Sequence, residues 1–134
     1  IESEWVARQP QPRIVGYGTL LVMHSATVDG ITIEYWRAIT MWATSYYPAV
    51  TSNTTASGLP LAKGVAAVDR RYIPFYTRMY VPGYGEVIAA DVGGGVVGRW
   101  IDLGYSDEDY VSWHSYVTVY FLWPPPANIV YIIP

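Results

Sequence analysis

The feature that most constrains the fold is a series of short runs of β-branched and aromatic residues separated by glycine and proline. Two runs, at 20–28 and 31–42, are followed by runs at 65–68, 78–81, 86–90, 96–101 and 116–122. Val, Ile, Tyr and Trp favour strands, and runs this short do not suit helices. Many short strands at close spacing are typical of a small barrel or sandwich. We therefore predict an all-β domain.

An N-terminal β-hairpin is predicted around Asp29-Gly30, which separates the first two runs. A two-residue type I′ turn needs positive φ at both central residues, which Asp-Gly accommodates. The prolines at 10 and 12 predict an extended linker before the hairpin. We therefore divide the chain into a linker and hairpin extension over 1–38 and a barrel domain over 39–134.

One short helix is predicted at Ser106, because Ser106 is a good N-cap and Asp109 follows three residues later. Residues 48–64 are rich in Pro, Ser, Thr, Asn and Gly and are expected to form a loop. Three prolines at 124–126 end the compact part. Residues 129–133 either add a late edge strand or belong to a following segment.

Composition excludes several classes of function. The net charge is −3 without a basic run, which disfavours nucleic-acid binding. The absence of cysteine excludes disulfides, thiolate zinc sites and Cys nucleophiles. No apolar stretch reaches the length of a membrane span, and His24 and His114 lack partners at metal-ligand spacing. We expect no metal and no cofactor, and the sequence leaves the oligomeric state open.

Three aspartates stand where acids are costly, at the ends of apolar runs. They are Asp69, Asp91 and Asp102. Burying a carboxyl group costs free energy unless the group is paired or takes part in function. A single Asp at the end of an apolar run is nevertheless more often a turn or cap residue. A carboxyl in a partly apolar site near a second carboxylate has a raised pKa and can protonate a glycosidic oxygen. The abundant Tyr (13) and Trp (6) suit sugar stacking, and equally suit β-structure.

Short motifs in a fixed order between residues 39 and 123 indicate a family. They are Thr-Ser-Tyr-Tyr-Pro at 44–48, Thr-Ala-Ser-Gly at 55–58, Ala-Val-Asp at 67–69, Ile-Pro at 73–74, Gly-Tyr-Gly at 83–85, Ala-Asp-Val-Gly-Gly at 90–94, Gly-Arg-Trp-Ile-Asp-Leu at 98–103, Trp113 and Val-Thr-Val-Tyr at 117–120. This order resembles the three-Asp (3D) domain shared by membrane-bound lytic transglycosylase A and the small stationary-phase survival muralytic proteins. The spacings between the aspartates, 22 and 11 residues, are similar to those of the small members.

The resemblance implies a six-stranded double-psi β-barrel and a peptidoglycan lytic transglycosylase. Such an enzyme cleaves the MurNAc-β-1,4-GlcNAc bond without water and leaves a 1,6-anhydro-MurNAc end. By resemblance, Asp102 is the acid and then the base, Asp91 orients it, and Asp69 completes the acidic cluster. The substrate would be peptidoglycan strands, and the location extracytoplasmic, secreted or wall-associated in a bacterium. Residues expected at the sugar groove are Thr44, Tyr46, Gly93, Gly94 and Trp100, of which Trp100 is equally suited to core packing.

The sequence departs from the family pattern at four positions. Arg70 replaces a usual Pro, Tyr76 a usual Gly, Val97 a usual Lys, and His114 a common Gly. None of these changes removes an acid, so they put substrate preference in doubt more than the reaction. Two alternatives stay open: a non-catalytic glycan-binding barrel of a larger wall protein, and a hydrolase or expansin-like barrel of the same architecture.

Overall fold

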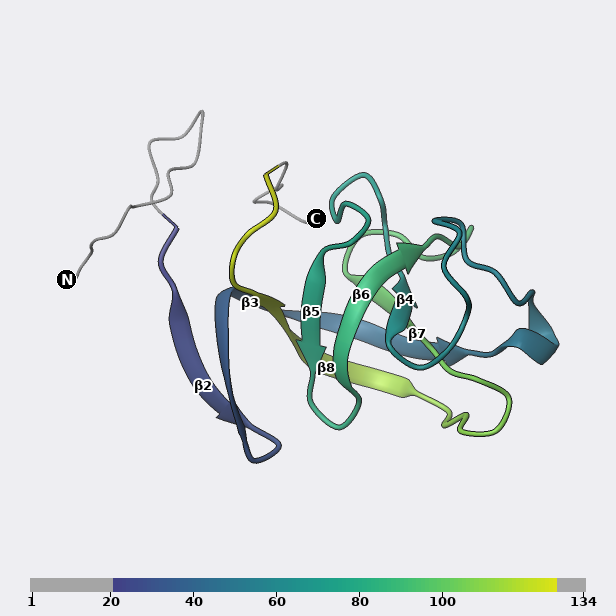
Figure 1. The fold of residues 1–134 in the computed structure, drawn as a ribbon, viewed down its shortest axis with the longest axis horizontal. Helices are drawn as coiled ribbons and strands as arrows, with labels where there is room; N and C mark the ends of the chain where they lie inside the picture. Colours follow the sequence, from purple (N-terminus) through teal and green to yellow (C-terminus); the bar gives the residue numbers. More distant parts are fainter. Residues whose placement is uncertain (1–20, 128–134) are drawn as a thin grey trace.

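The computed structural model describes residues 21–127, and the strands in this range form one closed sheet (Figure 1). Its order is β2-β3-β7-β4-β6-β5-β8, and β8 pairs back onto β3. Six strands, β3 to β8, therefore form a barrel with β2 as an extra strand outside it, which confirms the predicted fold class. The strands are β2 (His24–Val28), β3 (Ile31–Tyr46), β4 (Val65–Ala67), β5 (Arg78–Val81), β6 (Gly85–Asp91), β7 (Trp100–Gly104) and β8 (His114–Leu122).

Two parallel pairings organise the barrel. β3 runs parallel to β7 and β4 parallel to β6, whereas the other neighbours in the ring are antiparallel. Parallel strands need long connections: residues 47–99 lie between β3 and β7, and residues 68–84 lie between β4 and β6. Because β4 lies between β6 and β7, residues far apart in sequence meet on three adjacent strands.

The predicted hairpin forms and docks on the barrel. Asp29 and Gly30 have φ of 52° and 80°, as a type I′ turn requires. The Asp29 carboxylate accepts hydrogen bonds from the Tyr80 hydroxyl (3.1 Å) and the Gly83 amide (2.8 Å). β3 continues from the hairpin into the barrel wall, so the two expected regions, 1–38 and 39–134, share one strand. The linker prolines lie outside the described residues.

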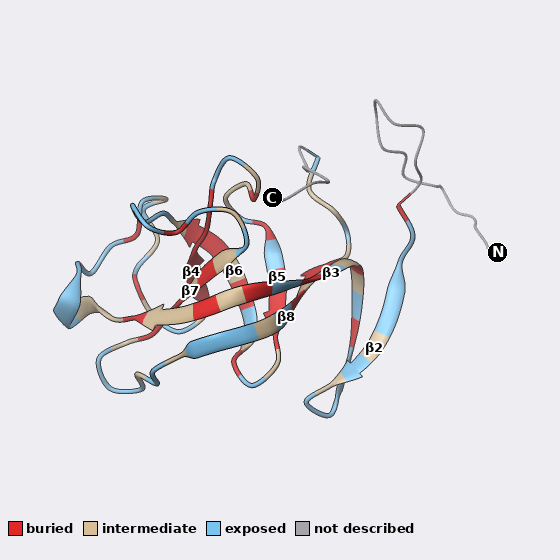
Figure 2. Cartoon of the chain, turned by 180° about the vertical axis from the view of Figure 1, so that it is seen from behind, coloured by how far each residue is buried: buried red, intermediate tan, exposed pale blue. Residues whose placement is uncertain are grey.

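Alternation along the strands separates an inner core from an outer face. The barrel interior is filled by fully buried side chains, among them Met41, Met79, Ile101, Leu103 and Val119. Figure 2 shows buried residues through β4 and β7 and exposed ones along β2 and the start of β8. A second apolar cluster includes Tyr46, Leu61 and Ala67. Neighbouring residues in a strand point to opposite faces, so Thr44 and Asp102, beside buried Ala43 and Ile101, point outward.

The helix predicted at Ser106 does not form; residues 107–109 are a turn. The expected cap is present, since Asp109 accepts bonds from the Ser106 amide and hydroxyl, both 2.8 Å. A helix cannot follow because the next backbone groups bond to β3. The Ser45 hydroxyl donates to the Val111 carbonyl (2.7 Å) and accepts from the Trp113 amide (2.8 Å). Within residues 21–127 the helical structure is one 3-10 turn, Pro48–Val50.

Strand β7 begins at Trp100, four residues later than the sequence predicts. The Val96 amide donates to the Gly93 carbonyl (3.0 Å), which makes a turn, and Gly98 has a φ of 62°. The segment 96–99 is therefore part of the loop before β7. The late edge strand considered at 129–133 lies outside the described residues.

Candidate active site

Two of the three aspartates lie in one row across the outer face of the barrel. Ala67 on β4 is the register partner of Asp91 on β6 and of Asp102 on β7, and Asp102 is the partner of Thr44 on β3. Register partners project from the same face of a sheet. Asp91, Ala67, Asp102 and Thr44 therefore form a continuous acidic row, in which the side chain between the two acids is the methyl group of Ala67 on β4.

A β-bulge aims Asp91 into this row. Ala66 is paired with Ala89, but the next residue, Ala67, is paired with Asp91 rather than Ala90. Bulges re-aim side chains in this way, and they are common beside active sites. The bulge leaves Ala90 buried in the second apolar cluster, while Asp91 stays partly exposed.

Asp102 is held by a chain of two hydrogen bonds. The Thr44 hydroxyl donates to Asp102 Oδ1 (2.8 Å) and accepts from Trp100 Nε1 (2.9 Å). Burial raises the pKa of Asp102 above its ordinary value, the charge of Asp91 raises this pKa further, and the Thr44 hydrogen bond lowers it. A carboxyl with a raised pKa holds its proton closer to neutral pH, as a general acid must.

Asp91 receives three hydrogen bonds that fix its orientation. The Tyr46 hydroxyl donates to Oδ2 (2.7 Å), and the amides of Ala56 and Val92 donate to Oδ1 (2.8 and 2.9 Å). Burial raises the pKa of Tyr46 far above its ordinary value, and the hydrogen bond to Asp91 acts in the same direction. Tyr46 therefore keeps its proton and serves as a donor to the Asp91 carboxylate.

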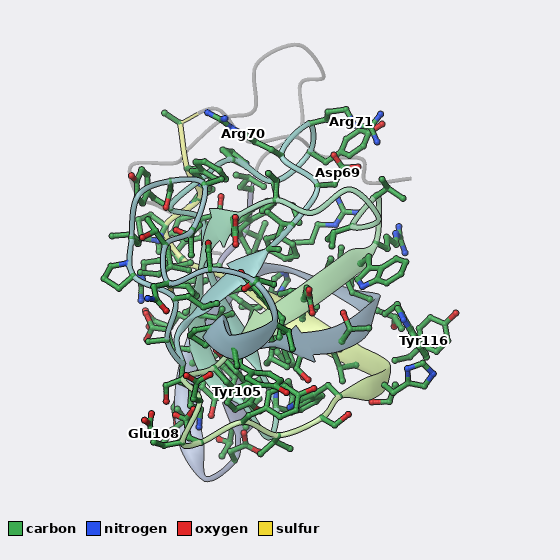
Figure 3. All side chains as sticks on the ribbon, turned by 90° about the vertical axis from the view of Figure 1, so that its right-hand side faces the viewer. Asp69, Arg70, Arg71, Tyr105, Glu108 and Tyr116 are labelled. Atoms are coloured by element: carbon green, nitrogen blue, oxygen red, sulfur yellow. The ribbon has the colours of Figure 1, made fainter. Side chains whose placement is uncertain are left out.

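Asp69 lies two residues beyond Ala67 and makes a different set of contacts. Its carboxylate accepts from Arg71 Nε (3.0 Å) and Nη2 (2.8 Å) and from the Gly98 amide (2.7 Å). The Arg71 guanidinium lowers the pKa of Asp69 to about 2. Figure 3 shows Asp69 beside Arg71, with Tyr116 projecting from another side of the barrel. Asp69 thus ties the loop before β7 to the end of β4.

The remaining predicted site residues divide between the row and the loop after Asp91. Thr44 and Tyr46 bond directly to the acids, and Trp100 bonds to Thr44. Gly93 and Gly94 lie in the exposed segment that follows Asp91; an added Cβ on Gly94 would meet open space, and one on Gly93 would lie 3.0 Å from Val96.

Sequence reasoning gave no role to the Ala56 and Val92 amides or to Ala67. The only indication in the sequence that Ala56 matters is its position in the 55–58 motif. A backbone amide donor cannot be recognised from residue type, because every residue except proline has one. The structure also accounts for the glycine usual at position 76. Tyr76 has a φ of 72°, in the left-handed region that glycine adopts most easily.

Within residues 21–127, no three His, Asp or Glu side chains gather in a way that would hold a metal ion. No helix in the same range has the length and hydropathy needed to cross a bilayer.

Comparison with known proteins relates this barrel to proteins of the bacterial cell wall. The chain is 39% identical over 87 residues to the cell wall-binding protein YocH of Bacillus subtilis. The aligned region covers 60% of this chain and 30% of the relative. It is 33% identical over 78 residues to the putative cell wall shaping protein YabE of the same organism, covering 54% of this chain and 19% of that relative. The chain therefore spans less than a third of the length of either relative. No solved structure gives a significant match.

The family comparison agrees with the motifs and with the geometry of the row. The family model described as the 3D domain matches residues 64–123. This segment carries Asp69, Asp91 and Asp102 and includes β4 to β8. Residues 64–123 therefore match the 3D domain family.

Proposed function

We propose that this domain is a peptidoglycan lytic transglycosylase in which Asp102 acts as acid and then as base. The observation that carries the proposal is the acidic row, with Asp102 half-buried, hydrogen-bonded to Thr44, and within the field of Asp91. The raised pKa of Asp102 suits a group that must donate a proton and later accept one at the same pH.

The proposed reaction needs one titrating carboxyl. Protonated Asp102 donates its proton to the glycosidic oxygen as the bond from MurNAc C1 to that oxygen breaks. The 6-hydroxyl of the same MurNAc attacks C1, and its proton passes to Asp102. The products are a GlcNAc with a free 4-hydroxyl and a 1,6-anhydro-MurNAc end, and Asp102 regains its starting protonation state without water.

The contacts of Asp91 favour an orienting role over that of a hydrolytic base. Both of its oxygens already accept hydrogen bonds, one from Tyr46 and the other from two backbone amides. An inverting hydrolase requires a second carboxylate that is free to activate water. We propose that the role of Asp91 is to raise the pKa of Asp102. The role of Asp69 is to hold the loop that leads into β7, through its hydrogen bond from the Gly98 amide.

The names of the relatives support a glycan partner and a location at the wall. One is a cell wall-binding protein and the other a putative cell wall shaping protein. We propose that the natural substrate is the peptidoglycan strand and that the domain works outside the cytoplasm of a bacterium. Trp100 and the Gly93-Gly94 backbone would contact the sugars on either side of Asp102.

A second candidate function is non-catalytic glycan binding. The observation that favours it is the name of the more similar of the two relatives, which specifies binding to the wall. A binding module would use the same outer face without needing Asp102 to change protonation.

Fragment release from purified peptidoglycan distinguishes the two functions. The unsubstituted domain is expected to release soluble fragments, and Asp102→Asn to bind the sacculus without releasing any, because an amide cannot donate and regain the proton. Release by Asp102→Asn close to that of the unsubstituted domain would show that the acid is assigned wrongly. Binding without release by both proteins would favour the binding module.

A further inference from the structure

A second row on the outer face is aromatic and lies directly beside the acidic row. Trp42 on β3 is the register partner of Trp100 on β7 and of Tyr116 on β8. Two residues further along β3, Thr44 of the acidic row is the partner of His114 on β8. We call Trp100, Trp42 and Tyr116 the aromatic row. It crosses three adjacent strands and continues past the edge of the acidic site onto β8.

The end of the aromatic row on β8 is exposed, and its rings contact one another. The Trp42 ring lies 4.7 Å from His114 and 4.9 Å from Tyr116, with interplanar angles of 78° and 66°. These edge contacts fix the indole ring between two neighbours. Tyr116 is 71% exposed, His114 is also exposed, and Figure 3 shows Tyr116 standing clear of the ribbon. Outward positions of a strand are usually polar, so a gathered aromatic group here marks a contact surface.

Hydrogen bonds join the aromatic row to Asp102. Trp100 donates to Thr44, and Thr44 donates to Asp102. Trp42 lies one strand away from β7, and Tyr116 lies two strands away. Neighbouring strands in a sheet are about 5 Å apart. A polymer held across Asp102 in this direction would place its next sugar rings over Trp42 and Tyr116.

The surroundings of this surface suit a neutral, hydroxyl-rich ligand. The next pair along β3 and β8 is Thr40 and Thr118, and both are exposed. Aromatic faces beside hydroxyl groups offer the apolar and polar contacts that a pyranose ring needs, because Trp and Tyr combine a flat apolar face with a polar edge.

We propose that Trp42, His114 and Tyr116 form an additional sugar-binding subsite for the glycan strand. The occupant is a pyranose ring of the same strand that lies across Asp102, beyond the two sugars of the scissile bond. This inference rests on the proposed function in one respect, because the subsite is taken to bind the same glycan strand that lies across Asp102. The subsite gives the domain a preference for long strands over short fragments.

Binding measured without cleavage tests the subsite. In an Asp102→Asn background, the affinity for long peptide-free glycan strands and for the MurNAc-GlcNAc disaccharide is measured by calorimetry. Tyr116→Ser, which changes an exposed residue, and Trp42→Leu are each expected to reduce the preference for long strands about five-fold, which corresponds to about 1 kcal/mol for one aromatic contact. Tyr76→Asn removes another exposed aromatic ring, which is 60% exposed, and is expected to leave the preference unchanged.

The outcomes separate this inference from the proposed reaction. A long-strand preference that Tyr116→Ser leaves intact overturns the subsite, whether or not the unsubstituted domain cleaves glycan. Equal affinity for long and short ligands before substitution overturns it too, as does a complete lack of glycan binding. A loss with Tyr116→Ser but not with Tyr76→Asn supports the subsite, even for a domain that releases no fragments.

Discussion

Asp69 and Asp102 are the same residue type one strand apart, and their environments push their pKa values in opposite directions. Asp69 pairs with the Arg71 guanidinium, which lowers its pKa to about 2. For Asp102, burial and the charge of Asp91 raise the pKa, while the neutral Thr44 hydroxyl donates a hydrogen bond that orients the carboxyl. At the residue scale, these contacts suit Asp102 to proton transfer and Asp69 to a permanent negative charge.

The pH dependence of release should shift in opposite directions in two variants. Asp91→Asn removes a charge that raises the pKa of Asp102, so the alkaline limb of the rate profile should move to lower pH. Thr44→Val removes a hydrogen bond that lowers this pKa, so its limb should move to higher pH. Both variants should also be slower, because each loses an orienting contact. The profile is measured as the rate of fragment release; a shift of the same sign in both would contradict the electrostatic roles.

At the same scale, the sequence predicts the identity of the acids better than their roles. Acids at the ends of apolar runs single out Asp91 and Asp102, and the family resemblance, not the runs, predicts that they lie side by side; the structure brings both into one row. The separate pairing of Asp69 could not be predicted, because it depends on the fold bringing the Gly98 amide to the end of β4. Nor could the bulge at Ala67, which sets the direction of Asp91, since it changes register without a distinctive residue.

At the element scale, the strands depend on loops that carboxylates hold in place. Asp91 accepts a hydrogen bond from the Ala56 amide, and Asp69 accepts one from the Gly98 amide. Asp29 joins the hairpin turn to the turn between β5 and β6. The sequence predicts most strands because their patterning agrees with their burial. It is wrong about the helix at Ser106 because Ser45 on β3 bonds the backbone that a helix would need, a long-range contact that local patterning does not contain.

Asp69→Asn should destabilise the domain at neutral pH and much less in acid. The lost charge-assisted hydrogen bonds to Arg71 and Gly98 contribute about 1–3 kcal/mol. Because the folded pKa of about 2 lies below the ordinary 3.8, this stability is present above about pH 4 and is lost as the pH falls through about 2. Denaturant unfolding across pH measures the difference. Glu86→Gln, which removes an exposed ion pair with Arg78, is the control and should cost less than about 1 kcal/mol; equal losses in both variants at neutral pH would refute the role given to Asp69.

Gly104→Ala should disturb the contact between β7 and β4. An added Cβ would lie 2.6 Å from the Val65 carbonyl oxygen and 2.9 Å from Leu61 Cδ1, and the backbone oxygen cannot swing away. We expect a loss of about 1–3 kcal/mol in unfolding free energy, as for other overpacked sites. Gly95→Ala meets open space and should stay within about 0.5 kcal/mol of the unsubstituted domain. Thermal unfolding of both variants checks this, and an equally stable Gly104→Ala would show that β4 and β7 are less closely packed than described.

At the scale of the whole molecule, barrel closure creates the site. The pairing of β3 with both β7 and β8 places Thr44 between Asp102 and His114, and the position of β4 between β6 and β7 brings Asp91 and Asp102 to one level. The sequence predicts an all-β barrel because strand runs, turn signals and family motifs agree. It could not predict that the aromatic row continues the acidic row, because that juxtaposition depends on the register of three strands.

The chemical form of the ends released from purified peptidoglycan tests the central claim most directly. The domain is incubated in water labelled with heavy oxygen, and the fragments are identified by mass spectrometry. A transglycosylase should give 1,6-anhydro-MurNAc ends that are lighter than hydrolysis products by one water and carry no label, since the attacking oxygen comes from the sugar itself. Fragments with ordinary reducing ends that carry the label would contradict the account, because they would show that water, rather than the MurNAc 6-hydroxyl, completes the reaction at Asp102.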